Sequence, residues 1–328
     1  MDSSRVRRRW LGILIGLAAG CIPPALSAQA WPTRPVRVIV PFAPGGGVDT
    51  VARLLAQRLG EQMGGSFVVD NRPGAGGVAG TTVVARAVPD GHTLLVSAPE
   101  FAINAASRRK LPFDAIRDFS FISQLTAGQF IIAAHPSVPA KSVRELIALA
   151  KAQPDRLTYG SSGSGGINHL AGALFQSMAG IRWTHVPFKG AGPATVGLIG
   201  GEIDFTIAST TGLLEPIRAG RVRAIAVTGS SRFAALPDVP TVAESGVPGY
   251  EVDGWYGFYG PAGMPRELIG RLQAETRRAL FHAETAERLV RTGNTPLASP
   301  PDTFAGFIKA EIDKWTRVIA AEGITPVD

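Results

Sequence analysis

From residue 35 onward, short apolar runs alternate with segments of helical periodicity, and this order restricts the fold more than any other feature. Residues 36–42 form an apolar run interrupted only by Arg37, which is typical of a strand buried on both faces of a sheet. Apolar residues recur at helical spacing over 51–59, and strands are expected at 67–69 and 93–97, with a helix near 81–87 between them. This alternation predicts a parallel sheet with right-handed crossovers.

A second alternating run follows an extended segment at 121–134. Strands are expected at 157–159, 183–187, 203–208 and 222–227, and helices at 142–151, 167–178, 193–199 and 213–219. After another extended segment at 255–259, helices are expected at 265–282, 286–291 and 301–322, with no further strand.

The two extended segments, near Thr126 and Gly254, predict two lobes joined by a two-stranded hinge. The first lobe is expected to span 31–127, the second lobe 128–253, and the mostly helical segment 254–328 to return to the first lobe. A cleft between two hinged lobes is a natural place for a ligand around which the lobes close.

The first thirty residues have the pattern of an export signal. Arginines at 5 and 7–9 precede an apolar run at 11–19, and Ala28-Gln29-Ala30 forms a cleavage site of small residues. The apolar run is shorter than the ~20 residues that span a bilayer. Residues 1–30 are therefore expected to be a signal peptide cleaved near Ala30, which predicts a periplasmic protein. The sequence leaves open whether export is by the Sec or the twin-arginine route, and lipoprotein anchoring at Cys21 is a less favoured alternative.

Cys21 is the only cysteine of the 328 residues, so the mature chain is expected to contain none. Disulfides, thiolate metal sites and thiol nucleophiles are excluded there. The full chain has a formal charge of +7, of which residues 1–30 supply +3, with four arginines against one aspartate. The remaining +4 is compatible with an anionic ligand, and we expect no nucleic-acid partner because no long basic run follows residue 30.

Three glycine-rich loops, at 42–50, 159–169 and 186–194, each join a predicted strand to a predicted helix. Ligands of open parallel sheets bind at the carboxyl ends of the strands. The free N–H groups of a helix start favour anions, and glycine lets an oxygen approach them closely. Any one such loop is as consistent with tight turning as with binding, whereas three divided between two lobes favour a shared anion site.

Enzymatic readings of these loops are weaker. No Gly-Lys pair occurs for a Walker loop, and Thr50 stands where a dinucleotide fingerprint needs its third glycine. Ser162 nearly fits a nucleophile elbow, but Ser164 replaces the second glycine, so an exported serine hydrolase is the least favoured alternative.

Several single residues allow two interpretations. His169 is a candidate base or metal ligand, but no partner lies at ligand spacing, so packing within its helix is favoured. Asp49 is expected to cap the first helix rather than to bind a substrate amine. Lys189 either counters a carboxylate or is a solvated loop residue. Trp255 and Tyr256 either wall the cleft or pack the hinge.

At these residues the chain resembles the periplasmic receptors of tripartite tricarboxylate transporters, also called Bug-type proteins. Besides the second and third loops, the resemblance is carried by Pro41-Phe42-Ala43-Pro44-Gly45-Gly46 with Asp49, Asn71-Arg72-Pro73-Gly74-Ala75-Gly76-Gly77, Pro89-Asp90-Gly91, Pro237-Asp238-Val239-Pro240-Thr241-Val242-Ala243-Glu244 and Pro261-Ala262-Gly263. It covers essentially the whole mature chain, in order.

The resemblance implies an α/β, two-lobed periplasmic-binding-protein fold (type II, Venus-flytrap) with two hinge strands. It implies a receptor, not an enzyme, that captures a small carboxylate, an organic acid or an amino acid, and delivers it to a membrane permease. A ligand-sensing role for a signalling partner is the alternative. No cofactor or metal is expected, and the chain is expected to be a monomer.

The implied ligand-binding residues are Phe42, Ala43, Gly45, Gly46, Asp49, Thr50, Ser97, Ala98, Ser161, Ser162, Gly163, Gly166, Asn168, Lys189, Gly190, Pro193, Ala194 and Ser209. Two positions depart from the family pattern. Gly197 replaces an acidic residue, and Glu100-Phe101 replaces a more polar stretch. Glu100 would repel a second carboxylate of the ligand if its side chain points inward.

Overall fold

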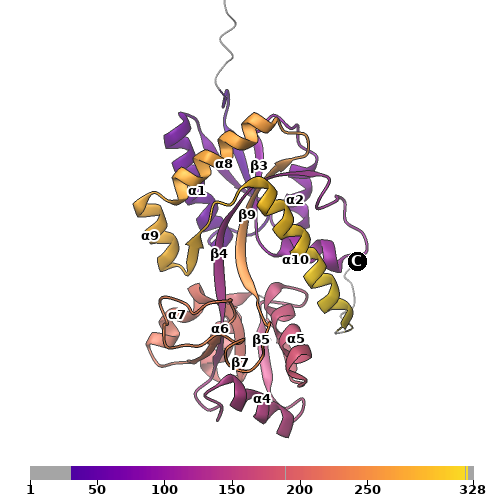
Figure 1. Cartoon of the computed structure of the whole chain (residues 1–328), viewed down its shortest axis with the longest axis vertical. Helices are drawn as coiled ribbons and strands as arrows, with labels where there is room; N and C mark the ends of the chain where they lie inside the picture. The colour runs from indigo at the N-terminus through magenta and orange to yellow at the C-terminus, as the bar shows by residue number, and fades with distance from the viewer. Residues whose placement is uncertain (1–30, 189, 322, 324–328) are drawn as a thin grey trace, which may run out of the picture.

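The computed structural model describes residues 31–188, 190–321 and 323 (Figure 1). The predicted signal peptide at 1–30, with Cys21, and the predicted binding residue Lys189 lie outside these residues. None of the helices in the described part of the chain combines the length and the apolar character needed to cross a membrane.

The first lobe contains the predicted parallel sheet. Strands β1 (Val36–Val40), β2 (Phe67–Asn71) and β3 (Thr93–Ser97) are parallel, with β1 in the middle. Helix α1 (Gly47–Met63) connects β1 to β2, and the 3-10 turn η1 (Ala75–Gly77) and helix α2 (Val78–Ala85) connect β2 to β3. Helix α3 (Glu100–Ser107) follows β3 and was not predicted.

The second lobe repeats this arrangement. Strands β5 (Thr158–Ser161), β6 (Thr184–Pro187) and β7 (Phe205–Ser209) are parallel, with β5 in the middle. Helices α4 (Val143–Ala152), α5 (Ile167–Ala179), α6 (Ala191–Gly200) and α7 (Thr210–Arg218) alternate with the strands, and β8 (Arg223–Val227) closes the run. The predicted alternation of this part is confirmed, with element ends shifted by at most three residues.

Two long strands join the lobes. Strand β4 (Phe119–Ala134) and strand β9 (Asp253–Pro261) pair antiparallel, and Figure 1 shows both running from the upper to the lower lobe. Gly128 pairs with Gly254, at the predicted crossings. The strand order β2-β1-β3-β9-β4-β7-β5-β6 places this pair in the middle of one continuous sheet. The predicted two-lobed α/β fold with two hinge strands is confirmed; the exact limits of the lobes stay a prediction.

The C-terminal segment differs from the prediction in one respect. Helices α8 (Arg266–Leu280), α9 (Ala283–Arg291) and α10 (Pro301–Ala321) were expected, but strand β10 (Asn294–Pro296) was not. Asn294 pairs with Gly128 of β4, so this segment adds a strand at the hinge. The expectation of no further strand was wrong because three residues carry no periodicity, and their partner strand lies far away in the sequence.

Helix α10 links the end of the chain to the hinge. The indole N–H groups of Trp255 on β9 and Trp315 on α10 both donate to Glu311 Oε2, at 3.1 Å each. Both tryptophans are fully buried, and Lys314 forms an ion pair with Glu311. Because a buried carboxylate needs such partners, this cluster fixes α10 against β9. In Figure 1 the helix continues past the hinge, and it packs against α3 of the first lobe and α5 of the second.

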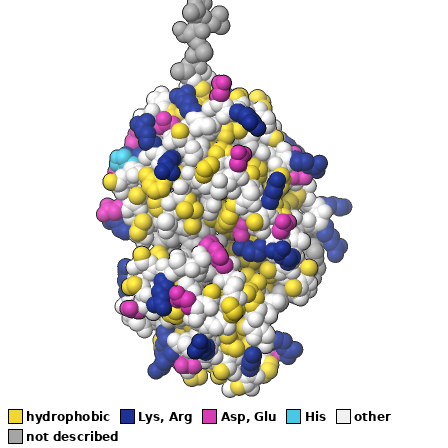
Figure 2. All heavy atoms as spheres, viewed as in Figure 1, with side chains coloured by type: hydrophobic (Ala, Val, Ile, Leu, Met, Phe, Trp, Pro, Cys, Tyr) yellow, Lys and Arg dark blue, Asp and Glu magenta, His cyan; other side chains and the backbone are white. Residues whose placement is uncertain are grey.

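The surface carries both signs of charge. On the face shown in Figure 2, lysine and arginine side chains are interspersed with aspartate and glutamate over both lobes, without a continuous basic stripe. This distribution is unlike the footprint of a nucleic-acid-binding face.

Candidate binding cleft

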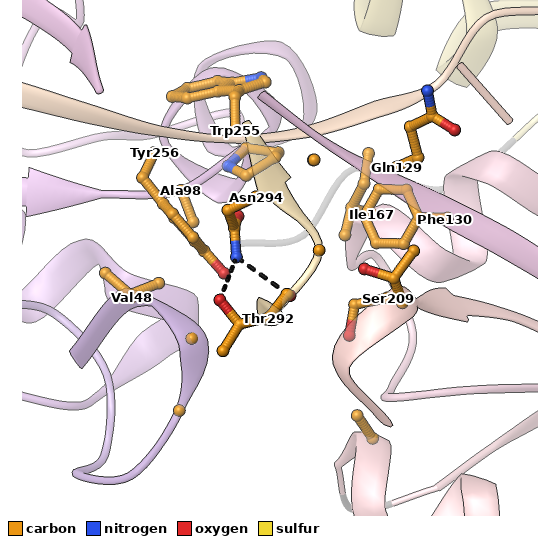
Figure 3. A pocket seen from close by; sticks show the side chains of 18 of the residues that line it. Val48, Ala98, Gln129, Phe130, Ile167, Ser209, Trp255, Tyr256, Thr292 and Asn294 are labelled. Atoms are coloured by element: carbon orange, nitrogen blue, oxygen red, sulfur yellow. Dashed lines mark hydrogen bonds between the residues drawn. The ribbon is translucent and has the colours of Figure 1, made fainter. Parts of the chain in front are cut away.

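A cavity of about 320 Å³ lies between the two lobes (Figure 3). Its residues come from the starts of helices in both lobes, from β4 and β9, and from the turn before β10. They are Phe42, Gly46, Gly47, Val48, Ala98, Pro99, Glu100, Gly128, Gln129, Phe130, Ile167, Ala191, Ser209, Thr210, Gly254, Trp255, Tyr256, Thr292, Gly293 and Asn294. Figure 3 shows Val48 and Tyr256 on one side, facing Ser209, Phe130 and Ile167 on the other.

Five helices begin at residues that line this cavity. Their first residues are Gly47 of α1, Glu100 of α3, Ile167 of α5, Ala191 of α6 and Thr210 of α7. The N–H groups in the first turn of a helix have no partner within the helix, and the helix dipole makes that end partly positive. The convergence of five such ends on one cavity makes it a favourable place for an anion.

None of these five helices is capped by a side chain of its own N-cap residue. Helices α8 and α9 also begin without such a hydrogen bond, so its absence alone does not mark a site. Helix α4, which starts away from the cavity, is capped: Glu145 N donates to Ser142 Oγ at 3.2 Å, and Lys141 N donates to Glu145 Oε2 at 2.6 Å.

The first glycine-rich loop is held by Asp49, which is 4% exposed. Asp49 Oδ2 accepts from Gly45 N and from Arg53 Nε at 2.9 Å each, and Asp49 Oδ1 accepts from Asn71 Nδ2 at 3.0 Å. Burial raises the pKa of Asp49, but hydrogen bonds from Arg53, Gly45 and Asn71 outweigh it and hold the pKa below the usual value. The carboxylate therefore stays ionised and fixes the loop from behind.

The prediction that Asp49 caps α1 is wrong in its position. The N-cap is Gly46, and Asp49 is the third residue of the helix, from which it reaches back to Gly45. Its hydrogen-bond partners Gly45, Arg53 and Asn71 belong to the loop and its surroundings, so Asp49 supports the cavity without lining it.

Gly47 allows Tyr256 to approach the start of α1. A Cβ atom at Gly47 would lie 2.1 Å from Tyr256 Oη, far inside van der Waals contact. Burial, and in addition the charge of Glu100, raises the pKa of Tyr256 to about 12, so at neutral pH its hydroxyl keeps the proton. Tyr256 therefore walls the cavity with a neutral hydroxyl group, while Trp255 both lines the cavity and packs the hinge.

The second glycine-rich loop uses its polar groups internally. Gly163 N donates to Ser161 Oγ at 3.2 Å, and Gly165 N donates to His169 Nδ1 at 3.0 Å. Ser162 Oγ donates to Asn168 Oδ1 at 2.8 Å, and Asn168 Nδ2 donates to Ile207 O at 2.6 Å. The cavity is lined from this loop by Ile167. Ser162 is thus a structural donor within the loop.

His169 was predicted to pack within its own helix. Its ring instead stacks on that of His185 of β6, with ring centroids 4.0 Å apart. Burial lowers the pKa of both rings, and for His185, where His169 adds to the effect, to about 4. His185 Nε2 lies 2.6 Å from Ser161 Oγ. The sequence spacing did not reveal this neighbour because His169 lies on helix α5 and His185 on the following strand β6. In the described ranges no three His, Cys, Asp or Glu residues are grouped so that they could hold a metal.

The two lobes touch at one side of the cavity. Gly293, before β10, has φ +78°, and a Cβ there would lie 1.7 Å from Thr210 Oγ1 at the start of α7. Beside it, Asn294 Nδ2 donates to Thr292 O and Thr292 Oγ1 at 3.2 Å each (Figure 3). The backbone of Gly293 therefore lies directly against the second lobe.

Of the predicted binding residues, Phe42, Gly46, Ala98 and Ser209 line the cavity. Those that do not line it are Ala43, Gly45, Asp49, Thr50, Ser97, Ser161, Ser162, Gly163, Gly166, Asn168, Gly190, Pro193 and Ala194. Lys189 lies outside the described residues. The prediction missed the β4 residues at 128–130 and the turn at 292–294, for which the sequence offered no binding motif.

Comparison with known proteins agrees with this architecture. A model of the tripartite tricarboxylate transporter family receptor matches residues 51–324. Protein BugT of Bordetella pertussis is 35% identical over 315 residues, which cover 95% of this chain and 96% of BugT.

Two solved structures of related proteins contain ligands. Rpa4515 of R. palustris with adipate has a TM-score of 0.82 and 35% identity, over 90% of this chain and 100% of that one. MatC of Rhodopseudomonas palustris with bound malate has a TM-score of 0.77 and 33% identity, over 88% of this chain and 100% of MatC. The chain therefore belongs to the family of tripartite tricarboxylate transporter receptors, which are solute-binding proteins and not enzymes.

Proposed function

We propose that this chain is a periplasmic receptor that captures a small carboxylate in the cleft between its lobes and delivers it to the membrane permease of a tripartite tricarboxylate transporter. The observation that carries the proposal is the convergence of five helix starts on one cavity. The ligands of the two related structures, adipate and malate, are carboxylates, and they support the same class of ligand here.

Hydrogen bonds from backbone amides and the helix dipoles can together supply the binding free energy of a micromolar complex. A hydrogen bond to a charged group contributes about 1.5–3 kcal/mol, and a helix terminus adds about 0.3–1 kcal/mol. A few backbone amides around one carboxylate therefore reach the roughly 8 kcal/mol of a micromolar complex. This binding free energy requires no charged side chain, although Lys189 would add one if it binds the carboxylate as predicted.

The walls of the cavity indicate an apolar body for the ligand. Phe42, Val48, Phe130, Ile167 and Trp255 line it together. Apolar surface that a ligand removes from water contributes about 25 cal/mol per Å². An acid with an aliphatic or aromatic body would use these walls, whereas a small fully polar acid would leave them unfilled.

The test is thermal unfolding of the mature protein with a panel of acids. Monocarboxylates, dicarboxylates, amino acids and aromatic acids are each added to residues 31–328. A ligand present at about 100 times its dissociation constant should stabilise the protein by about 2.7 kcal/mol, and the matching neutral amide should not. Silence of the whole panel would contradict the proposal.

A matched pair of variants locates binding in the cleft. Ser209→Trp places a large side chain at the start of α7, on the cavity wall, and should abolish stabilisation by the acid. Ser142→Trp makes the same change at the N-cap of α4, away from the cavity, and should leave the acid-induced stabilisation intact. Equal loss of binding in both variants would argue against the cleft.

The permease partner is tested separately from the ligand. The exported protein, loaded with the acid that stabilises it, should co-purify with a tripartite tricarboxylate permease from detergent-solubilised membranes. In the absence of membranes, the purified protein should migrate as a monomer in size-exclusion chromatography. Recovery of a sensor kinase instead would favour the signalling alternative. We also expect the exported chain to begin at Trp31; a lipid-modified Cys21 at its N-terminus would overturn that expectation.

A further inference from the structure

Glu100 stands apart from the other residues of the cavity. It is the first residue of α3 and lines the cavity wall. Among the described lining residues it is the only acidic one, and lysine, arginine and histidine are absent from that set. No other described residue forms a hydrogen bond or an ion pair with its carboxyl group, which contacts its own backbone amide. An acidic residue that pairs with no other described residue therefore lines the space proposed for the ligand.

The surroundings make this group sensitive to the charge of a ligand. Burial raises the pKa of Glu100, against the effect of the hydrogen bond to its own amide. The charge of Glu100 contributes to the raised pKa of Tyr256, on the wall beside the start of α1. Glu100 is partly buried. At such a position two like charges repel more strongly than in bulk water, and an opposite charge or a hydrogen-bond donor is attracted more strongly.

The five helix starts are consequently not equivalent. The start of α3 already carries an acidic side chain of the protein itself, because Glu100 lies in its first turn. Helices α5, α6 and α7 have no acidic residue in their first turn. Helix α1 has one, Asp49, but its carboxylate accepts hydrogen bonds from Gly45 and Asn71 and does not line the cavity. A ligand carboxylate is therefore favoured at those four helix starts and disfavoured beside α3.

We propose that Glu100 determines ligand specificity: it selects an acid with a single carboxylate whose other end presents a hydrogen-bond donor, above all an ammonium group, and it rejects a second carboxylate. The inference rests on the proposed function, since it concerns the same cleft. It assigns this chain a preference opposite to the dicarboxylates named for the two related structures.

The test compares pairs of ligands that differ only at one end. Adipate, 6-aminohexanoate and 6-hydroxyhexanoate, with shorter and longer homologues of each, are titrated into the mature protein by calorimetry. We expect the protein to bind the best amino acid of the series more tightly than the dicarboxylate of equal length. In Glu100→Gln the ratio of the two dissociation constants should shift toward the dicarboxylate by about 10- to 100-fold, the effect of one charge-assisted hydrogen bond.

Glu145→Gln is the matched control, because Glu145 also lies in the first turn of a helix but away from the cavity. It should leave the ratio unchanged. Tighter binding of the dicarboxylate by the unmodified protein would overturn the inference, and this outcome requires no variant to fold. An unchanged ratio in a folded Glu100→Gln would also overturn it, while binding of acids would leave the proposed function standing. If no acid of any class binds to either protein, the proposed function fails, and the inference fails with it.

Discussion

The two glycine-rich loops at 42–50 and 159–169 resemble each other in sequence but differ in what they present to the cavity. Each follows a parallel strand and leads into a long helix, α1 or α5. In the first loop, Gly46, Gly47 and Val48 line the cavity, while Asp49 holds the loop from behind. In the second loop, the amides of Gly163 and Gly165 are bonded to Ser161 and His169, and Ile167 reaches the cavity.

This difference shows that glycine content does not distinguish a binding loop from a self-satisfied one. The two loops differ in which of their backbone amides are already hydrogen-bonded to side chains of the protein. Asp49 bonds to one amide, that of Gly45, and leaves those at the start of α1 to the cavity. Ser161 and His169 instead take up amides within their own loop. A buried amide must find a partner, and in the second loop the chain itself supplies it.

The largest effect that would test the comparison is expected at Gly47. In Gly47→Ala the new Cβ would overlap Tyr256 Oη, so the tyrosine or the start of α1 must move. We expect the affinity for the best acid of the panel to fall by about 100-fold, or about 2.7 kcal/mol. Calorimetry measures it.

The matching change in the second loop is Gly166→Ala, where a Cβ would meet its nearest atom at 3.7 Å, an ordinary contact. Affinity should then change less than about twofold, since no wall of the cavity moves. Adding Tyr256→Phe to Gly47→Ala removes the overlapping hydroxyl and should recover part of the lost affinity. Equal losses at Gly47 and Gly166 would break the comparison.

A smaller effect is expected for Asp49→Ala, mainly on stability. The change leaves Gly45 N without its acceptor and removes one of the two acceptors of Asn71 Nδ2, which keeps Phe42 O. It should cost about 2 kcal/mol in the free energy of unfolding. Denaturant unfolding at neutral pH measures this loss, and unchanged stability would show that Asp49 does not hold the loop.

The pH dependence of stability, compared between the unmodified protein and Asp49→Ala, tests whether Asp49 is ionised in the folded protein. The pKa of Asp49 is lower in the folded protein than in the unfolded chain. Its contribution is therefore present above the unfolded pKa and is lost as the pH falls through the folded pKa. The stability difference between the unmodified protein and Asp49→Ala should shrink in acid. A difference that is constant with pH would contradict an ionised Asp49.

Asn168→Ala should act in the second loop with a still smaller loss of stability. Asn168 is 8% exposed, and its amide joins Ser162 to the backbone of β7 through two hydrogen bonds. Loss of both should cost about 1–2 kcal/mol. The affinity should change much less than in Gly47→Ala. A loss of affinity without a loss of stability would place Asn168 in the binding surface after all.

The smallest effect is expected for Ser162→Ala, which removes one hydrogen bond, to Asn168. We expect a loss of about 0.5–1 kcal/mol in stability and no change in affinity. Thermal unfolding with and without the acid separates the two quantities. A tenfold loss of affinity would show that Ser162 contacts the ligand, contrary to this expectation.

Much of the fold follows from local patterns in the sequence. Strand β3 was predicted at 93–97 and occupies Thr93–Ser97, and the helix predicted at 301–322 occupies Pro301–Ala321. These segments have strong periodicity or clear ends. Helix α3 was missed because its eight residues begin after Pro99 without a capping side chain. Strand β10 exists only because β4 offers it a partner.

The site was less predictable than the fold. The start of α1 was identified because a glycine-rich turn between a strand and a helix is a local signal. The sequence did not indicate that the polar groups of the second loop bond to the protein itself. The stacking of His169 on His185 and the hydrogen bond from Asn168 to Ile207 join residues that are distant in the sequence. The turn at 292–294 enters the cavity through its tertiary position beside Thr210.

The most direct test of the account is the response of individual backbone amides to the ligand. Mature protein labelled with nitrogen-15 is titrated with the tightest acid of the panel, and amide chemical shifts are followed by NMR. We expect the largest changes at Gly47 and Val48 in the first lobe and at Thr210 in the second, with small changes at Gly163 and Gly165. Large shifts at Gly163 and Gly165, with Gly47 and Val48 unchanged, would contradict it.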